Sequence, residues 1–501
     1  MRHWLNNRIA VYWGVAICSG LLTLYRISTR DLINGDGIVY IDIARAFLSE
    51  GISAAIAVYH WPFYGILIGV VHKLTGLSFE NSAIGLNTLF LIVVCVVFVR
   101  VYEEISGREA RIWVAAILVL ALPILNEYRE MVIRGYGFWA CMLAALYYFI
   151  QYSRSPGLQS ALKWQLSIAV ATLFRVEGVA FLVFAPFCLL FMAEARGRIV
   201  THLFRLNGLF LLLAAAGVLV MLVSGELTTR MEIPNQLDYT SPLALLGALN
   251  TEAGMMYGRN RFMGSVDEAR LILAAGLLTL VLVKVLSNTG LAFLAVWGYG
   301  VHRKWIRLTR ESYIVLYFAA IGFLTLVPVA GNYFFISTRY TILTVLLISL
   351  IMFQYVDYLF RELSARQLHK WSLAAGVFIL ILFLDGVISG PGSKRNIRVA
   401  GEWLASGIAA EERIACNEAR LEFYAEDRCK WIPLGKLKLT LTEYINELKK
   451  QGYTYLLFWI DREDAPLRLA VEADSSLVLE KEFPNNKGDS VRLYRVVAEE
   501  Y

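Results

Sequence analysis

Long apolar runs separated by short polar segments make up most of the first 388 residues. They fall near 9–27, 62–75, 81–101, 110–126, 131–151, 162–177, 178–194, 203–224, 271–286, 288–301, 313–330, 340–358 and 371–388. Several approach the ~20 residues that a helix needs to cross a bilayer. The chain is 58% hydrophobic and only 18% charged, which is outside the usual composition of a soluble domain. The pattern predicts a polytopic α-helical membrane protein.

Basic residues predict how the helices are oriented. The six segments 1–8, 100–111, 152–163, 194–205, 302–310 and 359–370 hold 17 of the 47 lysines and arginines in 65 of the 501 residues. Such loops usually stay in the cytoplasm. All six basic segments fall on the cytoplasmic side only if runs 62–75 and 271–286 do not cross the membrane. We therefore expect interfacial helices there. About eleven transmembrane helices remain, with the N-terminus inside. The net charge of +6 then reflects topology and does not indicate nucleic-acid binding.

The composition changes near Gly390, where the apolar runs end. Short strands are predicted at 413–417, 430–434, 454–460, 477–482 and 491–497, and helices at 398–410, 418–426 and 441–451. We therefore predict a membrane domain over 1–388, with extracytoplasmic loops 28–80 and 225–287, and a small extracytoplasmic α/β domain over 389–501. This second domain has no glycine-rich phosphate loop, and nucleotide binding has no support.

Two of the six cysteines, Cys416 and Cys429, lie in this polar tail. In an oxidising compartment they could form a structural disulfide, one following a strand and the other opening the next. The other four lie in apolar spans, where a thiol is a small hydrophobic group. No Cys/His spacing resembles a zinc site.

Charged residues of the membrane domain gather at the face opposite the basic loops. They are Asp36, Asp42, His60, Glu127, Arg129, Glu130, Arg134, Arg175, Glu177, Glu232, Arg259, Arg261 and Arg339. Charges along a transport path would instead lie near the bilayer midplane. A site at one membrane face is therefore expected.

Asp36 lies between Gly35 and Gly37, directly after the first apolar run. The residues that follow have helical spacing, so a short amphipathic helix is predicted with Asp36 at its N-terminus. The carboxylate is either a general base for an attacking hydroxyl or amine, or an N-cap in a solvated turn. The collected charge at this face favours the base. Asp42, six residues on, does not share a helical face with Asp36, and the two make a poor metal site.

Six arginines share the face of Asp36: Arg129, Arg134, Arg175, Arg259, Arg261 and Arg339. Guanidinium groups bind phosphate with two parallel hydrogen bonds and are costly near lipid without a partner. They could hold a lipid phosphate, or form structural salt bridges such as Arg175 with Glu177. His60 opens an aromatic and proline cluster with Trp61 and Pro62, which is typical of an interface belt or shapes a pocket over Asp36.

Several motifs, taken in order, resemble the GT-C glycosyltransferases, in particular the branch of protein O-mannosyltransferases and lipid A aminoarabinose transferases. They are Asp36-Gly37-Ile38-Val39-Tyr40 with Ala44-Arg45, His60-Trp61-Pro62-Phe63-Tyr64-Gly65, Lys73-Leu74-Thr75-Gly76, Glu127-Tyr128-Arg129-Glu130, Arg134-Gly135-Tyr136, Phe174-Arg175-Val176-Glu177-Gly178, Arg339-Tyr340 and Ala400-Gly401-Glu402-Trp403-Leu404. The resemblance extends over most of the chain.

The resemblance implies a polyprenyl-phosphate-linked sugar as donor, an active site at the outer face and inversion at the anomeric carbon. Asp36 would activate the acceptor, with Tyr40, His60 and the six arginines binding substrate and phosphate. The sequence departs from the family in two places. Gly37 stands where many relatives have Glu, and Arg134 where the aminoarabinose branch has a carboxylate. A second catalytic acid and a pair of metal ligands therefore cannot be assigned to this chain from the resemblance, and we expect a reaction without a metal.

Three other functions fit a polytopic protein of this kind: a transporter or flippase of lipid-linked saccharide, a polysaccharide polymerase or ligase, and an inactive scaffold that binds only a carrier lipid. The sequence leaves the sugar and the acceptor open, and the acceptor could be a lipid, a glycan or a protein. A bacterial inner membrane is the expected location.

Overall fold

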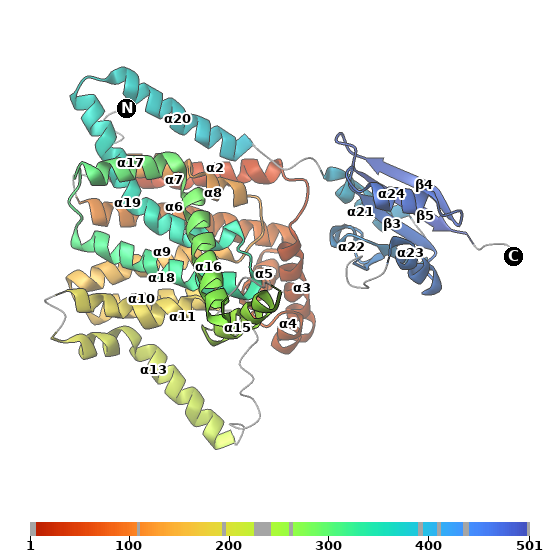
Figure 1. The fold of residues 1–501 in the computed structure, drawn as a ribbon, viewed down its shortest axis with the longest axis horizontal. Coiled ribbons are helices and arrows are strands. Elements are labelled where there is room, and N and C mark those ends of the chain that lie inside the picture. Colours follow the sequence, from red (N-terminus) through yellow and green to blue (C-terminus); the bar gives the residue numbers. More distant parts are fainter. Residues whose placement is uncertain are drawn as a thin grey trace. The chain divides into compact units, whose positions relative to one another are not determined.

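The computed structural model describes residues 7–501 except 108–110, 193–196, 225–241, 260–263, 389–393, 408–411, 434–439 and 498–501. The chain folds into two compact units (Figure 1). Unit 1 comprises residues 1–26 and 43–389, and unit 2 comprises 27–42 and 390–501. The sequence predicted a division at 389. It did not predict that 27–42 belongs with the C-terminal residues.

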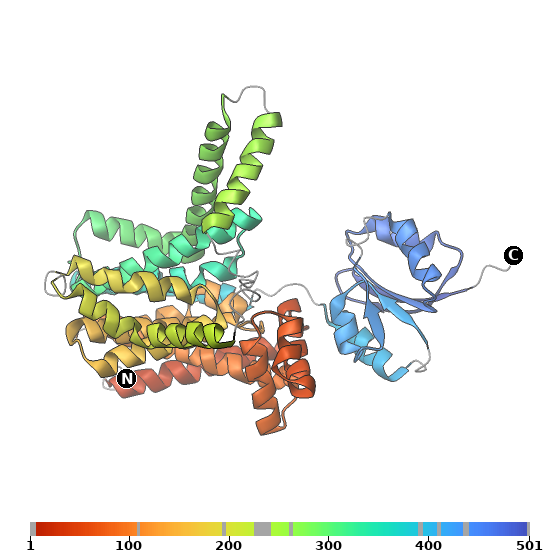
Figure 2. The same cartoon turned by 90° about the horizontal axis from the view of Figure 1, so that it is seen from below.

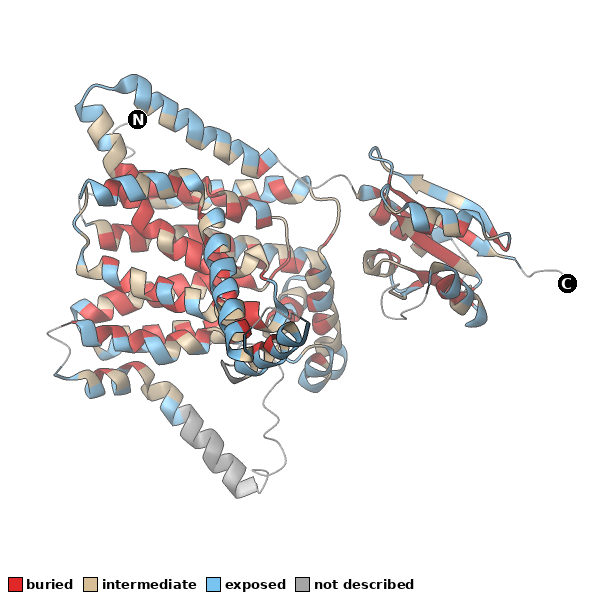
Figure 3. Cartoon of the chain, in the orientation of Figure 1, coloured by how far each residue is buried: buried red, intermediate tan, exposed pale blue. Residues whose placement is uncertain are grey.

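The secondary structure of unit 1 is helical in its described residues, and the second half of α3 (Gly35–Glu50) belongs to it. Its helices are α2 (Arg8–Ser28), α4 (Ile52–Val58), α5 (Phe63–Thr75), α6 (Phe79–Ser106), α7 (Ile112–Leu120), α8 (Pro123–Tyr128), α9 (Gly135–Arg154), α10 (Leu158–Phe174), α11 (Gly178–Phe184), the 3-10 helix η1 (Ala185–Phe191), α13 (Ile199–Ser224), α15 (Pro242–Arg259), α16 (Val266–Thr289), α17 (Leu291–His302), α18 (Arg310–Tyr333), α19 (Thr338–Ala365) and α20 (His369–Ile388). Figure 3 shows that buried residues gather in central helices such as α9 and α19, whereas α20 is largely exposed.

Six of the described helices are long and apolar enough to cross a membrane: α2, α6, α16, α18, α19 and α20. The expected eleven spans remain a prediction. Run 62–75 corresponds to α5, whose 13 residues are too short to cross. Run 271–286 corresponds to α16, which has the length of a span but runs across the neighbouring helices and projects from the bundle together with α15 (Figures 1 and 2).

The six basic segments meet at one end of the unit 1 bundle. Arg8 and Arg154 on α2 and α9 pair with Glu103 and Glu104 at the end of α6. The remaining links are Arg154 Nε to Glu311 at 2.9 Å, Arg310 to the Ser153 carbonyl at 3.2 Å, Arg205 to the Pro156 carbonyl at 3.5 Å, and Asp357 to both Arg111 and Arg361 at 2.6 and 2.7 Å. The six basic segments therefore lie at the same end of unit 1, as expected if all of them face one side of the membrane.

Unit 2 contains a five-stranded mixed sheet in the order β2-β1-β3-β5-β4. The strands are β1 (Ile414–Cys416), β2 (Cys429–Trp431), β3 (Tyr455–Ile460), β4 (Leu477–Pro484) and β5 (Ser490–Val496), and the helices are α21 (Arg395–Gly407), α22 (Ala419–Tyr424), α23 (Leu441–Lys450) and α24 (Ala465–Glu472). β1 pairs in parallel with β2 and β3, whereas β5 is antiparallel to β3 and β4. The predicted strands and three helices are present, and α24 was not predicted.

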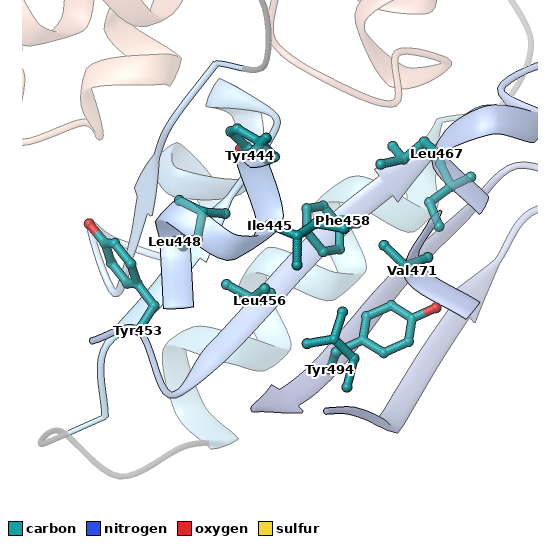
Figure 4. Packing of buried hydrophobic residues seen from close by; sticks show 12 residues of the cluster. Tyr444, Ile445, Leu448, Tyr453, Leu456, Phe458, Leu467, Val471 and Tyr494 are labelled. Atoms are coloured by element: carbon teal, nitrogen blue, oxygen red, sulfur yellow. The ribbon is translucent and has the colours of Figure 1, made fainter. Parts of the chain in front are cut away.

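The side chains of β3 alternate between two apolar cores, one on each face of the sheet. Leu456 and Phe458 point into a cluster with Tyr444 and Leu448 of α23 (Figure 4). Leu457, between them, faces the other cluster, which is built with α21 and α22. Successive side chains of a strand point to opposite faces, so each face of β3 supports its own helical layer.

Asp357→Asn should destabilise unit 1. The buried Asp357 carboxylate faces two half-exposed guanidinium groups, and its neutralisation removes their shared counter-charge. We expect a loss of about 1–3 kcal/mol of unfolding free energy, measured by thermal unfolding in detergent. Asp267→Asn is the matched control because its pair with Arg270 is exposed and contributes about 0–1 kcal/mol. Equal effects of the two substitutions would contradict this account.

Candidate functional site

Asp36 lies in the first turn of α3 (Gly35–Glu50), as the sequence predicted. The helix begins after Asn34, whose carbonyl accepts hydrogen bonds from the amides of Gly37 and Ile38 at 2.9 and 3.3 Å. Asp36 is half-buried and is the second residue of the helix, so it is not the N-cap. A carboxylate in the first turn is favoured by the helix dipole. Tyr40, one turn later, is buried.

Arg134 precedes α9 in unit 1 and is half-buried. Its guanidinium lies over the ring of Tyr59, 5.3 Å from the ring centroid. Its Nη1 atom is buried and has no hydrogen-bond partner, and no ion pair joins Arg134 to a carboxylate among the described residues. A buried donor without an acceptor is costly. Arg134 therefore has unused capacity to bind an anion.

Arg175 and Glu177 form an ion pair in the connection between α10 and α11. Burial raises the pKa of Glu177, but the guanidinium groups of Arg175 and Arg134 outweigh it and leave this pKa below its usual range. Glu177 is therefore ionised at neutral pH. The structural pairing weighed for Arg175 is the one present in the structure.

An aromatic ring connects Arg175 to Arg339 at the start of α19. The guanidinium groups of Arg175 and Arg339 lie 4.6 and 5.5 Å from the centroid of the Tyr340 ring. Arg175 also lies 5.5 Å from the ring of Phe138. Arg134 acts electrostatically on Glu177, the partner of Arg175, and we call Arg134, Arg175 and Arg339 the arginine cluster.

Arg129 lies in the interior of unit 1 and is 1% exposed. Its Nε donates to Asn126 Oδ1 at 2.6 Å, and its Nη1 donates to Thr23 Oγ1 at 3.0 Å and to the carbonyl and hydroxyl of Ser19 at 3.2 and 3.3 Å. These partners are neutral oxygens that join α8 to α2, and Nη2 is buried without a hydrogen-bond partner. Phosphate binding by Arg129 remains a prediction, and its contacts are those of a structural cation.

The aromatic and proline cluster packs against the end of α10. Trp61 Nε1 donates to the Thr172 carbonyl at 3.2 Å, and Phe63 meets Phe174 edge to face at 5.0 Å. Gly137 makes this approach possible because a Cβ there would lie 2.3 Å from the Phe174 ring. The turn between α4 and α5 is thereby fixed beside the residues that precede Arg175.

Two other predicted site residues of unit 1 lie at its surface. His60 is exposed, and Arg259 is exposed at the end of α15. Arg261 lies outside the described residues. No group of three His, Cys, Asp or Glu residues in the described part of the chain could hold a metal ion.

Cys416 and Cys429 are free thiols whose sulfur atoms lie 3.1 Å apart. β1 and β2 pair in parallel and bring them together. Burial raises the pKa of Cys416 well above its usual value, so this sulfur is a poor nucleophile at neutral pH. The pair is suited to a structural role, and the disulfide remains a prediction.

Two contacts of these charged residues were not predicted from the sequence: the Tyr59 ring under Arg134, and the ion pair of Arg26 with Glu130. Tyr59, under Arg134, directly precedes the His60-Trp61-Pro62 cluster, whose aromatic character was the available signal. Arg26, at the end of α2, is 3% exposed and pairs with Glu130 at 2.9 Å. An arginine that ends an apolar run was the signal for this second pair.

Known proteins resemble this chain in structure. No protein-family model and no curated protein matches the sequence. ArnT from Cupriavidus metallidurans, solved bound to undecaprenyl phosphate, is similar with a TM-score of 0.59 and 14% identity over 97% of both chains. The archaeal oligosaccharyltransferase AglB from Archaeoglobus fulgidus, in complex with an inhibitory peptide and a dolichol-phosphate, gives a TM-score of 0.52 and 12% identity over 98% of this chain and 74% of its own. The chain has the fold of these polytopic GT-C membrane glycosyltransferases.

Proposed function

We propose that this protein is an integral-membrane glycosyltransferase. It moves a sugar from a polyprenyl-phosphate-linked donor to a lipid, glycan or protein acceptor at the outer face of a membrane. The observation that carries the proposal is Arg134, a cation with an unpartnered buried donor, in a fold shared with a protein solved with undecaprenyl phosphate. Fold alone does not imply function, so the proposal depends on this site.

The arginine cluster is suited to hold the donor phosphate. Arg175 is oriented by Glu177 and by the rings of Phe138 and Tyr340, which fix its guanidinium plane. Arg134 is held over Tyr59 with its Nη1 unused. A planar guanidinium donates two parallel hydrogen bonds to a phosphate, and fixing it in advance reduces the entropy lost on binding. In this proposal Arg134 binds the phosphate directly, and Arg175, whose charge is balanced by Glu177, shapes the site beside it.

Asp36 is the general base that acts on the acceptor. Its carboxylate takes the proton as the acceptor hydroxyl or amine attacks the anomeric carbon. The bond between that carbon and the phosphate oxygen breaks, and polyprenyl phosphate leaves with the electron pair. Direct displacement of this kind inverts the anomeric configuration. The arginines stabilise the charge that develops on the leaving phosphate.

The cellular setting follows from the same proposal. The basic end of unit 1 faces the cytoplasm, and the C-terminal domain lies on the other side of the membrane, in the periplasm of a bacterium. The donor and acceptor then meet outside the cytoplasm, where a lipid-linked sugar replaces a soluble nucleotide sugar. Reversible binding of membrane lipids is expected, with no nucleic-acid partner.

Asp36→Asn should reduce turnover by about 10²–10⁴-fold, the usual contribution of a general base. The measurement is release of undecaprenyl phosphate from a panel of radiolabelled undecaprenyl-phosphate sugars by purified protein. Asp42→Asn, the same change on the same helix, is the control and should retain most activity. Equal rates for wild type and Asp36→Asn would exclude Asp36 as the base. Uptake of intact donor into sealed vesicles without release would instead support the transporter.

Arg134→Gln should weaken binding of undecaprenyl phosphate by about 10- to 100-fold, because a hydrogen bond to a charged group is lost. Binding is measured by titrating the lipid into purified protein in detergent. Arg303→Gln is the control, since Arg303 also lies over a tyrosine ring, 5.6 Å from Tyr299, but belongs to a basic segment at the other end of the bundle. Unchanged affinity in Arg134→Gln would remove Arg134 from the phosphate site.

A further inference from the structure

Three consecutive residues before α3 contact the C-terminal residues of unit 2. Asp31 Oδ2 accepts a hydrogen bond from the Lys394 amide at 3.0 Å. Leu32 packs against the apolar cluster formed by α21, α22 and the sheet. The Ile33 amide donates to the Tyr424 hydroxyl at 2.9 Å. A segment from the beginning of the chain is thus bound to a domain that lies about 360 residues later.

Asp31 is bound at a helix end. Lys394 directly precedes α21, so the Asp31 carboxylate accepts from a backbone amide at the N-terminus of that helix. Such a carboxylate satisfies an amide without an intrahelical partner and interacts favourably with the helix dipole. This contact fixes one end of the segment.

Tyr424 fixes the other end. It ends α22, is 8% exposed, and its ring lies under the Arg398 guanidinium at 5.4 Å. α21 approaches it closely at Gly401, where a Cβ would lie 2.6 Å from the Tyr424 Cβ and 3.1 Å from its carbonyl carbon. Packing therefore places the Tyr424 hydroxyl, and Gly401 is required for that placement.

We infer that Tyr424 is a positioning residue for Asp36, through which the C-terminal domain sets the start of α3. Ile33 is 0% exposed, so its amide would lose its hydrogen bond inside the protein if Tyr424 moved. Asn34, the next residue, accepts the first hydrogen bonds of α3, and Asp36 follows within that turn. A shift of the backbone at Ile33 would therefore displace the Asp36 carboxylate. The inference rests on the proposed function of Asp36, and it gives the C-terminal domain a role in the reaction.

Hydrogen–deuterium exchange of the full-length protein tests the anchor without any substrate. In Tyr424→Phe, amides of residues 31–38 should exchange about fivefold faster, the factor expected for one net hydrogen bond. Tyr444→Phe is the matched control: it removes a hydroxyl that donates to the Ile432 carbonyl at 2.6 Å in the same domain and should leave these amides unchanged. Gly401→Ala displaces Tyr424 without removing its hydroxyl and should reproduce the Tyr424→Phe result. Unchanged exchange of 31–38 in both Tyr424→Phe and Gly401→Ala would overturn the inference.

A double-mutant cycle, measured with the undecaprenyl phosphate release assay, tests whether Tyr424 affects catalysis through Asp36. Tyr424→Phe should lower kcat about fivefold or more and leave KM for the donor within about twofold, because the phosphate contacts are intact. In an Asp36→Asn background it should have no further effect, since it acts through that carboxylate. Multiplicative losses, or a rise in KM alone, would overturn the inference. If Asp36→Asn itself leaves turnover unchanged, the proposed function fails, and the exchange experiment still decides whether Tyr424 anchors the segment.

Discussion

A guanidinium group inside a membrane protein requires an anion or a set of oxygen acceptors, because desolvation of its charge is costly. Unit 1 meets this requirement differently for each arginine. Arg26 pairs with Glu130, Arg175 with Glu177, and Arg129 is surrounded by neutral oxygens of α2 and α8. Arg134 retains a buried donor without a partner. Nη2 of Arg129 is also buried without a partner, but its other nitrogens donate to oxygens, whereas the contact of the Arg134 guanidinium among the described residues is the Tyr59 ring. This difference is why we propose Arg134 for the donor phosphate.

Local patterns were sufficient to predict much of the fold. The helical spacing after Asp36 predicted α3, and the break at Arg175-Val176-Glu177-Gly178 separates α10 from α11. The five strands of the C-terminal domain followed from short apolar runs. α24 was missed although Asp464 caps it and a proline occupies its first turn, which is a recognisable start signal.

The site could be predicted only in part because it depends on tertiary contacts. The sequence placed six arginines at one face and suggested the local pair of Arg175 with Glu177, but Arg129 and Arg134 contact Thr23 and Tyr59, which are distant in the chain. The grouping of residues 27–42 with the C-terminal domain is the clearest example, since the contact between Asp31 and Lys394 spans 363 residues. No periodicity or motif encodes such a contact, and the role it suggests for the C-terminal domain emerged only from the structure.

The fate of the anomeric carbon is the most direct test of the proposed transfer of a sugar from a lipid phosphate. Purified protein would be given an undecaprenyl-phosphate sugar labelled with carbon-13 at C1, together with a membrane lipid extract as acceptor, and followed by NMR. We expect the label to move from the phosphate ester to a new glycosidic bond of inverted configuration, with an equal amount of undecaprenyl phosphate released. A label that stays in the donor while the donor crosses sealed proteoliposomes would contradict the account and identify a transporter.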